Sequence, residues 1–92
     1  MDKELLFITV IGQDKKGIVA KISGFLYECN INIEDISQGI MEGHFVMTML
    51  VDIHETNRDL ETINASLQKI ADDIGMKIQI QHQNVFKMMH RI

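Results

Sequence analysis

Residues 12–24 read GQDKKGIVAKISG, and they are the segment of this 92-residue chain that most resembles a binding motif. Gly12 and Gly17 are five positions apart, as in a nucleotide-binding P-loop. A P-loop continues with lysine and serine or threonine, because these side chains contact the phosphates and magnesium. Here Gly17 is followed by Ile18 and Val19. The stretch therefore predicts a strand-to-helix turn whose backbone amides face some smaller anion.

The other reactive side chains do not converge on catalytic or metal-binding chemistry. His44 and His54 bracket one expected strand, so at about 3.3 Å per residue they lie roughly 33 Å apart and cannot share a metal. His82 and His90 have no partner at ligand spacing. Cys29 falls on an apolar helix stripe, where a buried, inert thiol is expected. We expect no enzymatic activity, no metal and no cofactor.

Composition excludes further classes of protein. The net charge is −4 and only five side chains are aromatic, whereas nucleic-acid binding favours a basic face with stacking aromatics. No apolar run approaches the roughly 20 residues that span a bilayer. A single cysteine and the absence of a secretion-signal pattern favour a cytoplasmic protein. We therefore expect neither direct nucleic-acid binding nor a membrane segment.

Two segments have the apolar spacing of amphipathic helices. The first begins after Gly17 and is expected to stop at Asn30. The second has Thr56 and Asn57 as candidate N-caps and Gly75 as its C-terminal stop. Their apolar stripes comprise Ile18, Ile22, Phe25, Leu26 and Cys29 in the first, and Leu60, Ile63, Leu67, Ile70 and Ile74 in the second.

Four segments are predicted as strands, and together with the helices they give the order strand, helix, strand, strand, helix, strand. The strands are residues 4–11, 31–41, 45–53 and 76–82. Glu42-Gly43 supplies a hairpin turn between the middle two. This order predicts an α+β, ferredoxin-like βαββαβ sandwich, with both helices on one face of a four-stranded antiparallel sheet. Right-handed crossovers place the first and third strands at its centre.

The chain contains no proline and no linker-like stretch, so residues 1–92 are expected to form one domain. Residues 84–92 are predicted to be a short C-terminal tail or helix. The two central strands are apolar on both faces, and Thr9 and Thr48 lie on the face away from the helices. An uncovered apolar face of this kind predicts a homodimer. The alternative is that the tail folds over the sheet.

The segment TVIGQDKKGIVAKISGFLYECNINIEDISQ resembles the first half of an ACT domain. The family signature is a strand, an Asp-Arg-Pro-Gly-Ile/Val-type turn, a helix, and an Asn-Ile step into the second strand. The similarity covers essentially the whole chain. It is strongest to small stand-alone ACT proteins and extends to the ACT modules of the glycine cleavage system transcriptional repressor. The resemblance implies a regulatory module that binds a small molecule, typically an amino acid, between two ACT domains.

Carried over to this sequence, the family's ligand-binding positions fall on the turn and on the start of the second strand. They are Gln13, Asp14, Lys15, Lys16, Gly17, Ile18, Asn30 and Asn32. The amides of Gly17 and Ile18 would hold a carboxylate, while Asp14 and Asn32 would take an ammonium group.

At two of these positions a structural role competes with ligand binding. Asp14 is a candidate N-cap for the first helix, and Asn30 is a candidate helix stop. Asn32 has fewer structural reasons to be an asparagine.

Two functions from different classes remain at this stage. One is a ligand-sensing regulatory module that acts as a homodimer. The other is a constitutive protein–protein interaction module that binds a protein partner and no ligand.

Overall fold

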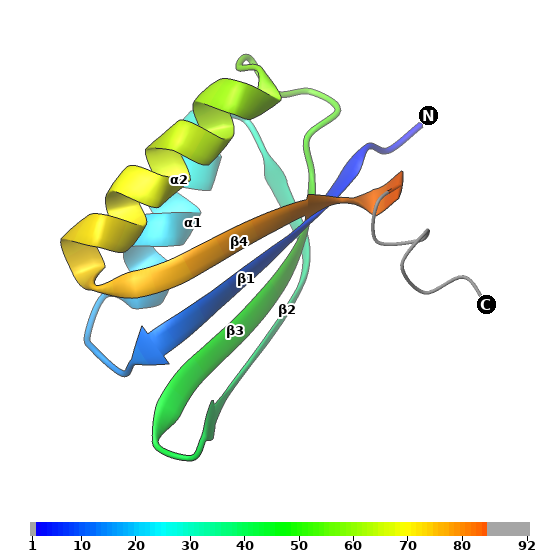
Figure 1. The fold of residues 1–92 in the computed structure, drawn as a ribbon. Coiled ribbons are helices and arrows are strands. Elements are labelled where there is room, and N and C mark those ends of the chain that lie inside the picture. Colours follow the sequence, from blue (N-terminus) through cyan, green and yellow to red (C-terminus); the bar gives the residue numbers. More distant parts are fainter. Residues whose placement is uncertain (1, 85–92) are drawn as a thin grey trace.

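The computed structural model describes residues 2–84, so all but the first residue of the tail predicted over residues 84–92 lies outside the described part. The elements follow the expected βαββαβ order (Figure 1). They are β1 (Leu5–Gln13), α1 (Ile18–Glu28), β2 (Asn32–Met41), β3 (His44–Asp52), α2 (Leu60–Ile74) and β4 (Met76–His82). The four strands form one antiparallel sheet in the order β2-β3-β1-β4, which confirms the predicted ferredoxin-like fold.

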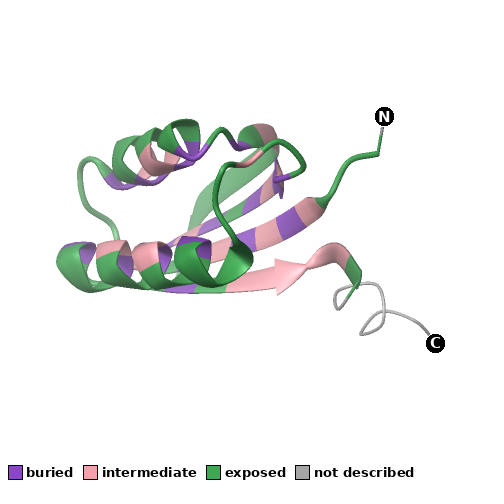
Figure 2. Ribbon diagram, turned by 90° about the horizontal axis from the view of Figure 1, so that it is seen from above, coloured by how far each residue is buried: buried purple, intermediate pink, exposed green. Residues whose placement is uncertain are grey.

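Burial alternates along the central strands because neighbouring side chains point to opposite faces of a sheet. In β1 the fully buried side chains are Leu6, Ile8 and Val10, and in β3 they include Met47 and Met49. These side chains pack against the inner faces of the two helices, where Ile22, Leu26, Ile63 and Leu67 are also fully buried. Figure 2 shows the buried positions gathered between the helices and the sheet. The core therefore occupies one face of the sheet.

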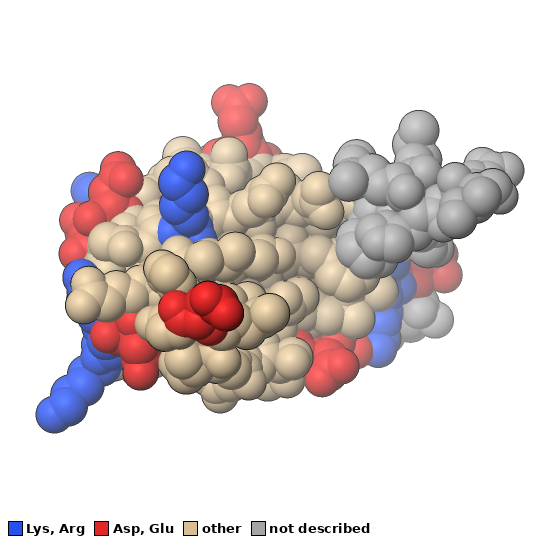
Figure 3. Space-filling model, turned by 60° about the horizontal axis from the view of Figure 1, so that its bottom comes forward, with Lys and Arg blue, Asp and Glu red and all other residues tan. Residues whose placement is uncertain are grey.

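Within residues 2–84, α1 and α2 both lie on one face of the sheet and leave the opposite face without a helix (Figure 1). Phe7 of β1 lies opposite Leu50 of β3, and Ile11 lies opposite Val46. Phe7, Leu50 and Val46 are half-buried and Ile11 is 44% exposed. Seen from the β2–β3 hairpin side, the surface has a broad stretch of uncharged side chains with few charged ones among them (Figure 3). The predicted apolar outer face is therefore present on this chain.

Helix α2 is capped by residues other than the predicted Thr56 and Asn57. Asp59 is its N-cap, and its Oδ1 accepts a 2.8 Å hydrogen bond from the backbone amide of Thr62. This bond holds the pKa of the Asp59 carboxyl below its usual value. Thr56 instead donates its hydroxyl to the carbonyl of Cys29, at the end of α1. The prediction was wrong because the loop ties Thr56 to the other helix, whereas the C-terminal stop at Gly75 is confirmed by its positive φ.

Gly12 is needed where β1 approaches the start of β4. A Cβ at this position would lie 2.3 Å from Sδ of Met76, 3.2 Å from the carbonyl oxygen of Gly75 and 3.3 Å from Cα of Met76. The last two atoms belong to the backbone and cannot move without shifting the strand pair. Gly24, inside α1, has nothing within 4 Å of a Cβ built there.

Replacement of these two glycines by alanine should change stability in opposite directions. Gly12→Ala is expected to lower the free energy of unfolding by roughly 1–3 kcal/mol, because the added methyl group overpacks the β1–β4 contact. Gly24→Ala is expected to raise it by roughly 0.5–1 kcal/mol, because alanine restricts the unfolded chain and favours the helix. Urea denaturation of both variants measures the difference. A Gly12→Ala variant as stable as the wild type would contradict the close contact.

Candidate functional site

The turn between β1 and α1 leaves the beginning of α1 without a side-chain cap. Gly17 is the N-cap residue with a φ of 85°, and no side chain accepts a hydrogen bond from the first helical amides. The first turn also contains no acidic residue. The interpretation of Asp14 as N-cap was therefore wrong: Gly17 makes the left-handed turn into the helix, and Asp14 stays three positions upstream. The amides at the start of Ile18–Glu28 are open to an anion.

The two lysines of the turn differ in where they lie. Nζ of Lys15 is 3.0 Å from the position that a Cβ at Gly75 would occupy, so its ammonium lies over the C-terminal end of α2. A cation there complements the partial negative charge of a helix C-terminus. Lys16 is exposed, and Gln13 ends β1 in register with His44 of β3. Both lysines are exposed, and Lys16 is the one that directly precedes Gly17.

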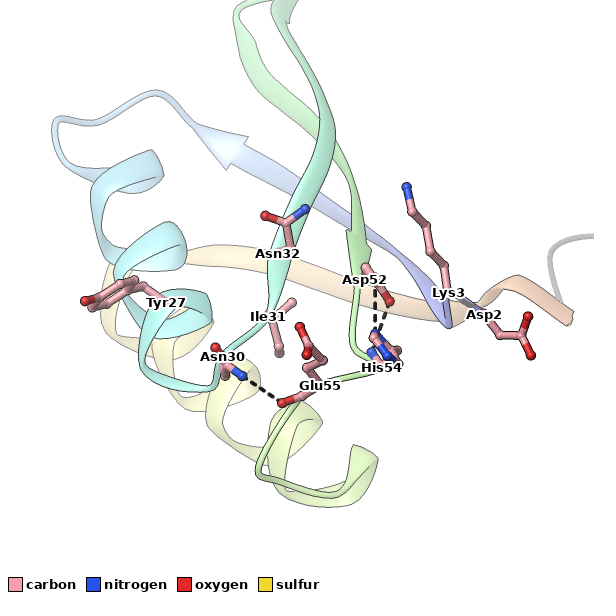
Figure 4. Close-up of a pocket in the computed structure, with 9 residues that line it drawn as sticks. All are labelled: Asp2, Lys3, Tyr27, Asn30, Ile31, Asn32, Asp52, His54 and Glu55. Atoms are coloured by element: carbon pink, nitrogen blue, oxygen red, sulfur yellow. Dashed lines mark hydrogen bonds and ion pairs between the residues drawn. The ribbon is translucent and has the colours of Figure 1, made fainter.

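Asn30 and Asn32 lie at the other end of α1, on the wall of a pocket of about 420 Å³ (Figure 4). The pocket is lined by Asp2, Lys3, Tyr27, Asn30, Ile31, Asn32, Asp52, His54 and Glu55. These residues come from the chain start before β1, the end of α1, the beginning of β2, and the end of β3 with its following loop. Three segments that are distant in sequence, residues 2–3, 27–32 and 52–55, therefore contribute polar groups to one pocket.

Asn30 has a clear structural role. Its φ of 58° places it in the left-handed region, and its backbone amide donates to the carbonyl of Tyr27. Its side-chain Nδ2 donates a 2.9 Å hydrogen bond to the carbonyl of Glu55, as Figure 4 shows. The prediction that Asn30 ends the helix is confirmed, and its side chain also joins the end of α1 to the β3–α2 loop.

Asn32 belongs to a polar cluster that links β2 to the N-terminal segment. Its Nδ2 donates a 2.5 Å hydrogen bond to Oε2 of Glu34, and Nζ of Lys3 pairs with the other carboxylate oxygen. The hydrogen bonds from Lys3 and Asn32 lower the pKa of the Glu34 carboxyl, and Glu34 raises the pKa of the Lys3 ammonium. In Figure 4, Oδ1 of Asn32 points away from Lys3. Asn32 can therefore hold Glu34 and still present an acceptor oxygen to the pocket.

The charges around the pocket favour a positively charged group. Burial opposes the charge of Asp52, but backbone hydrogen bonds from His54 and Glu4, together with attraction to His54 and Lys3, hold the pKa of its carboxyl below the usual value. Glu55 and Asp2 add two exposed carboxylates, while the ammonium of Lys3 is paired with Glu34. The pocket can therefore accept an ammonium group more readily than a carboxylate.

The predicted site residues fall into two groups that one chain does not bring together. Gln13 to Ile18 lie at the beginning of α1, and Asn30 and Asn32 lie beyond its end. The helix has 11 residues, and at 1.5 Å per residue it separates the groups by roughly 16 Å. A single small ligand cannot bridge this distance within one chain.

Several pocket residues were not predicted from the sequence. Lys3, Asp52 and His54 reach the pocket because β1 and β3 pair in the register Leu5↔Asp52. No short sequence motif connects positions this far apart, and only the register of the sheet would have identified them.

The described residues give no indication of a metal centre or a reactive thiol. Within residues 2–84 no three histidine, cysteine, aspartate or glutamate side chains are arranged to hold a metal ion. Cys29 is fully buried, and burial raises the pKa of its thiol. Neither helix in this part of the chain has the length and apolar character needed to cross a bilayer.

Comparison with known proteins agrees with the fold. The family model of the ACT domain matches residues 4–81. A UPF0237 protein of Methanococcus maripaludis is 49% identical over 97% of this chain and 99% of its own length. A UPF0237 protein of Bifidobacterium longum is 42% identical over 92% of this chain and 94% of its own length. This chain belongs to the ACT domain family, whose members are typically ligand-binding regulatory modules.

Solved structures show the same architecture. An ACT domain protein from Streptococcus pneumoniae superposes with a TM-score of 0.82 at 32% identity, covering 94% of this chain and 97% of that one. A putative glycine cleavage system transcriptional repressor matches with a TM-score of 0.77 at 18% identity, which shows the shared fold. The match covers 90% of this chain and 47% of the repressor.

Variants of Asn30 can separate its two structural contributions. Asn30→Gly keeps the positive φ but loses the bond to Glu55, which should lower the free energy of unfolding by about 1 kcal/mol. Asn30→Ala loses the bond and also strains the backbone, which should cost about 1 kcal/mol more. Urea denaturation gives both values. Equal stability of the two variants would show that the left-handed conformation of Asn30 contributes nothing measurable.

Proposed function

We propose that this protein is a regulatory module that binds an amino acid or a similar small carboxylate, and that it acts as a homodimer rather than as an enzyme. The observation that carries this proposal is the uncapped beginning of α1. A side chain often satisfies the first amides of a helix, whereas here Gly17 supplies none and Lys16 adds an exposed positive charge. A bound carboxylate would satisfy these amides.

The ammonium end of an amino acid would need an acidic or amide partner. Asp14 belongs to the same turn and is exposed. The pocket at the other end of α1 offers Oδ1 of Asn32 together with the carboxylate of Glu55. Because roughly 16 Å of helix separates this pocket from the turn, we propose that the turn of one chain meets the pocket of another. Each chain then contributes half of a site.

A site shared between two chains links ligand binding to dimerisation. The ligand stabilises the dimer by the same free energy by which the dimer strengthens ligand binding. The uncovered sheet face supplies apolar surface for association. A cytoplasmic location is part of the proposal and is supported by the single, buried cysteine. The effect of ligand binding would be transmitted by the change in dimerisation or by a protein partner.

The second candidate is a constitutive interaction module that binds a protein and no small ligand. The apolar sheet face favours it, because such a face fits a protein surface as well as a second copy. It differs from the first candidate in predicting no response to amino acids.

A thermal-shift screen of the twenty amino acids and related carboxylates distinguishes the two candidates. If the module senses a ligand, one or a few compounds should raise the melting temperature in proportion to ln(1 + [L]/Kd). At one hundred times Kd the stabilisation is about 2.7 kcal/mol, or roughly 10–20 °C for a domain of this size. If no compound raises the melting temperature, the ligand-sensing function is ruled out and the interaction module remains.

Substitution of Asn32 tests its place in the site. Asn32→Ala should abolish the thermal shift while the unliganded protein stays folded, because Asn32 is exposed. Asn57→Ala is the matched control, since Asn57 is also an exposed asparagine and does not line the pocket. If Asn32→Ala melts far below the control without ligand, Asn32 has a structural role instead.

The homodimer is tested by sedimentation at micromolar concentration. The wild type should sediment as two chains, and Leu50→Lys should produce monomers by placing a charge on the uncovered sheet face. Leu60→Lys, at an exposed leucine of α2, should leave the dimer unchanged. A wild-type monomer would rule out the dimer, and a dimeric Leu50→Lys would show that association uses a different surface.

A further inference from the structure

The apolar side chains of α2 and of β4 both lose their cover at the same end of the molecule. On α2, Ile63 and Leu67 are fully buried, whereas Leu60, the first residue of the helix, is 41% exposed. On β4, Ile78 is buried and Ile80 is only half-buried. Leu60 and Ile80 line one pocket of about 420 Å³ between the helix and the strand. The core is therefore open at this end.

The margin of this α2–β4 pocket is polar and carries negative charge. Glu61, Asn64 and His82 complete its lining, and Glu61 is exposed in the first turn of α2. Oε2 of Glu4 lies 2.9 Å from Nε2 of His82, so a second carboxylate lies next to the pocket. Apolar walls with carboxylates at the margin suit a segment that combines apolar side chains with basic ones.

The backbone turns toward the α2–β4 pocket as it leaves β4. His82 lies opposite Leu6 of β1, and side chains of directly opposite residues share a face of the sheet. The His82 ring is therefore on the helix side, where Leu6 is fully buried. The backbone amide of Asn84 donates a 3.2 Å hydrogen bond to Nδ1 of this ring. The last described residue is thus bonded to a side chain that lines the pocket.

The segment that follows has the side chains that this pocket suits. Residues 85–92 read VFKMMHRI, which combines apolar side chains with Lys87 and Arg91 and contains no acidic residue. Phe86 is its largest apolar side chain, and a buried aromatic ring removes more apolar surface from water than most other side chains. Phe86 comes two residues after Asn84, which is at most about 7 Å of extended chain. The ring can therefore reach the pocket.

We propose that residues 85–92 dock in the α2–β4 pocket of their own chain. The ring of Phe86 packs against Leu60 and Ile80 and closes the open end of the core. The basic side chains of the segment face Glu61. Docking on the helix side leaves the outer face of the sheet available to a partner, whereas a tail folded over the sheet would cover that face. This inference does not depend on the ligand of the proposed function.

Nuclear Overhauser spectroscopy of the wild-type protein tests this placement. Cross-peaks are expected between the ring protons of Phe86 and the methyl groups of Leu60 and Ile80. In a mixture of isotope-labelled and unlabelled chains, an isotope-filtered spectrum should show these cross-peaks within a chain and not between chains. The proposal is overturned if the ring instead contacts Leu50 on the outer face, if the cross-peaks arise between chains, or if the ring contacts neither Leu60 nor Ile80.

A double-substitution cycle measures the same contact through stability. Phe86→Ala should lower the urea midpoint of the wild type, and should lower it clearly less in a Leu60→Ala background, because substitutions of residues in contact are not additive. Ile40→Ala is the matched background, since Ile40 is also an exposed aliphatic residue but lies at the end of the sheet where β4 begins. There the loss should equal that of the wild type.

Phe86→Leu takes the place of Phe86→Ala in this cycle if the alanine variant does not fold. Equal losses of the urea midpoint in the wild-type, Leu60→Ala and Ile40→Ala backgrounds would overturn the contact. An equal reduction of the loss in the Leu60→Ala and Ile40→Ala backgrounds would also overturn it, because the coupling would then not be specific to Leu60.

Discussion

Strand β1 is hydrogen-bonded along both of its edges, and the rest of the molecule is arranged around this double pairing. It pairs with β3 from Leu5 to Gln13 and with β4 from Leu6 to Gly12. Because every second side chain of β1 is then directed to the helix side, the core must form there. The end of β1 also fixes where the turn to α1 begins, next to the start of β4. The conformation of the turn is therefore set by backbone pairing as much as by its own residues.

The turn shows how packing and binding share the same few residues. Position 12 requires glycine because it lies so close to Met76, and Lys15 extends over the end of α2. Both residues serve the junction between β1, α2 and β4. The amides that follow Gly17 are not used in this way. The segment thus divides into a part that supports the fold and a part that remains available to an anion.

The fold could be predicted from the sequence because its determinants are local. The helix stops at Asn30 and Gly75 and the hairpin turn at Gly43 are each visible within a few residues, and each is confirmed. Capping was predicted less well. Asp14 and Thr56 have the right residue type for a cap, but Gly17 and Asp59 occupy the cap positions. A cap depends on the path of the backbone, which residue type alone does not determine.

The candidate site could be predicted only in part for a related reason. Asn30 and Asn32 were identified through the resemblance to ACT domains, but carboxylates around them come from the start of the chain and from the end of β3 with its following loop. Their positions follow from strand register, which is a property of the whole sheet. The separation of the two predicted groups, by contrast, could be foreseen, since the helix predicted between Gly17 and Asn30 already places roughly 16 Å between its two ends.

The one-sided core has a consequence for how the molecule should respond to temperature. The face of the sheet that carries Phe7, Ile11 and Leu50 is in contact with solvent in the single chain. Whatever covers it removes apolar surface from water, and such burial carries a negative change in heat capacity. Apolar association weakens on cooling. The folded chain and its assembly should therefore differ in cold sensitivity, with the assembly dissociating at temperatures at which the individual fold is still stable.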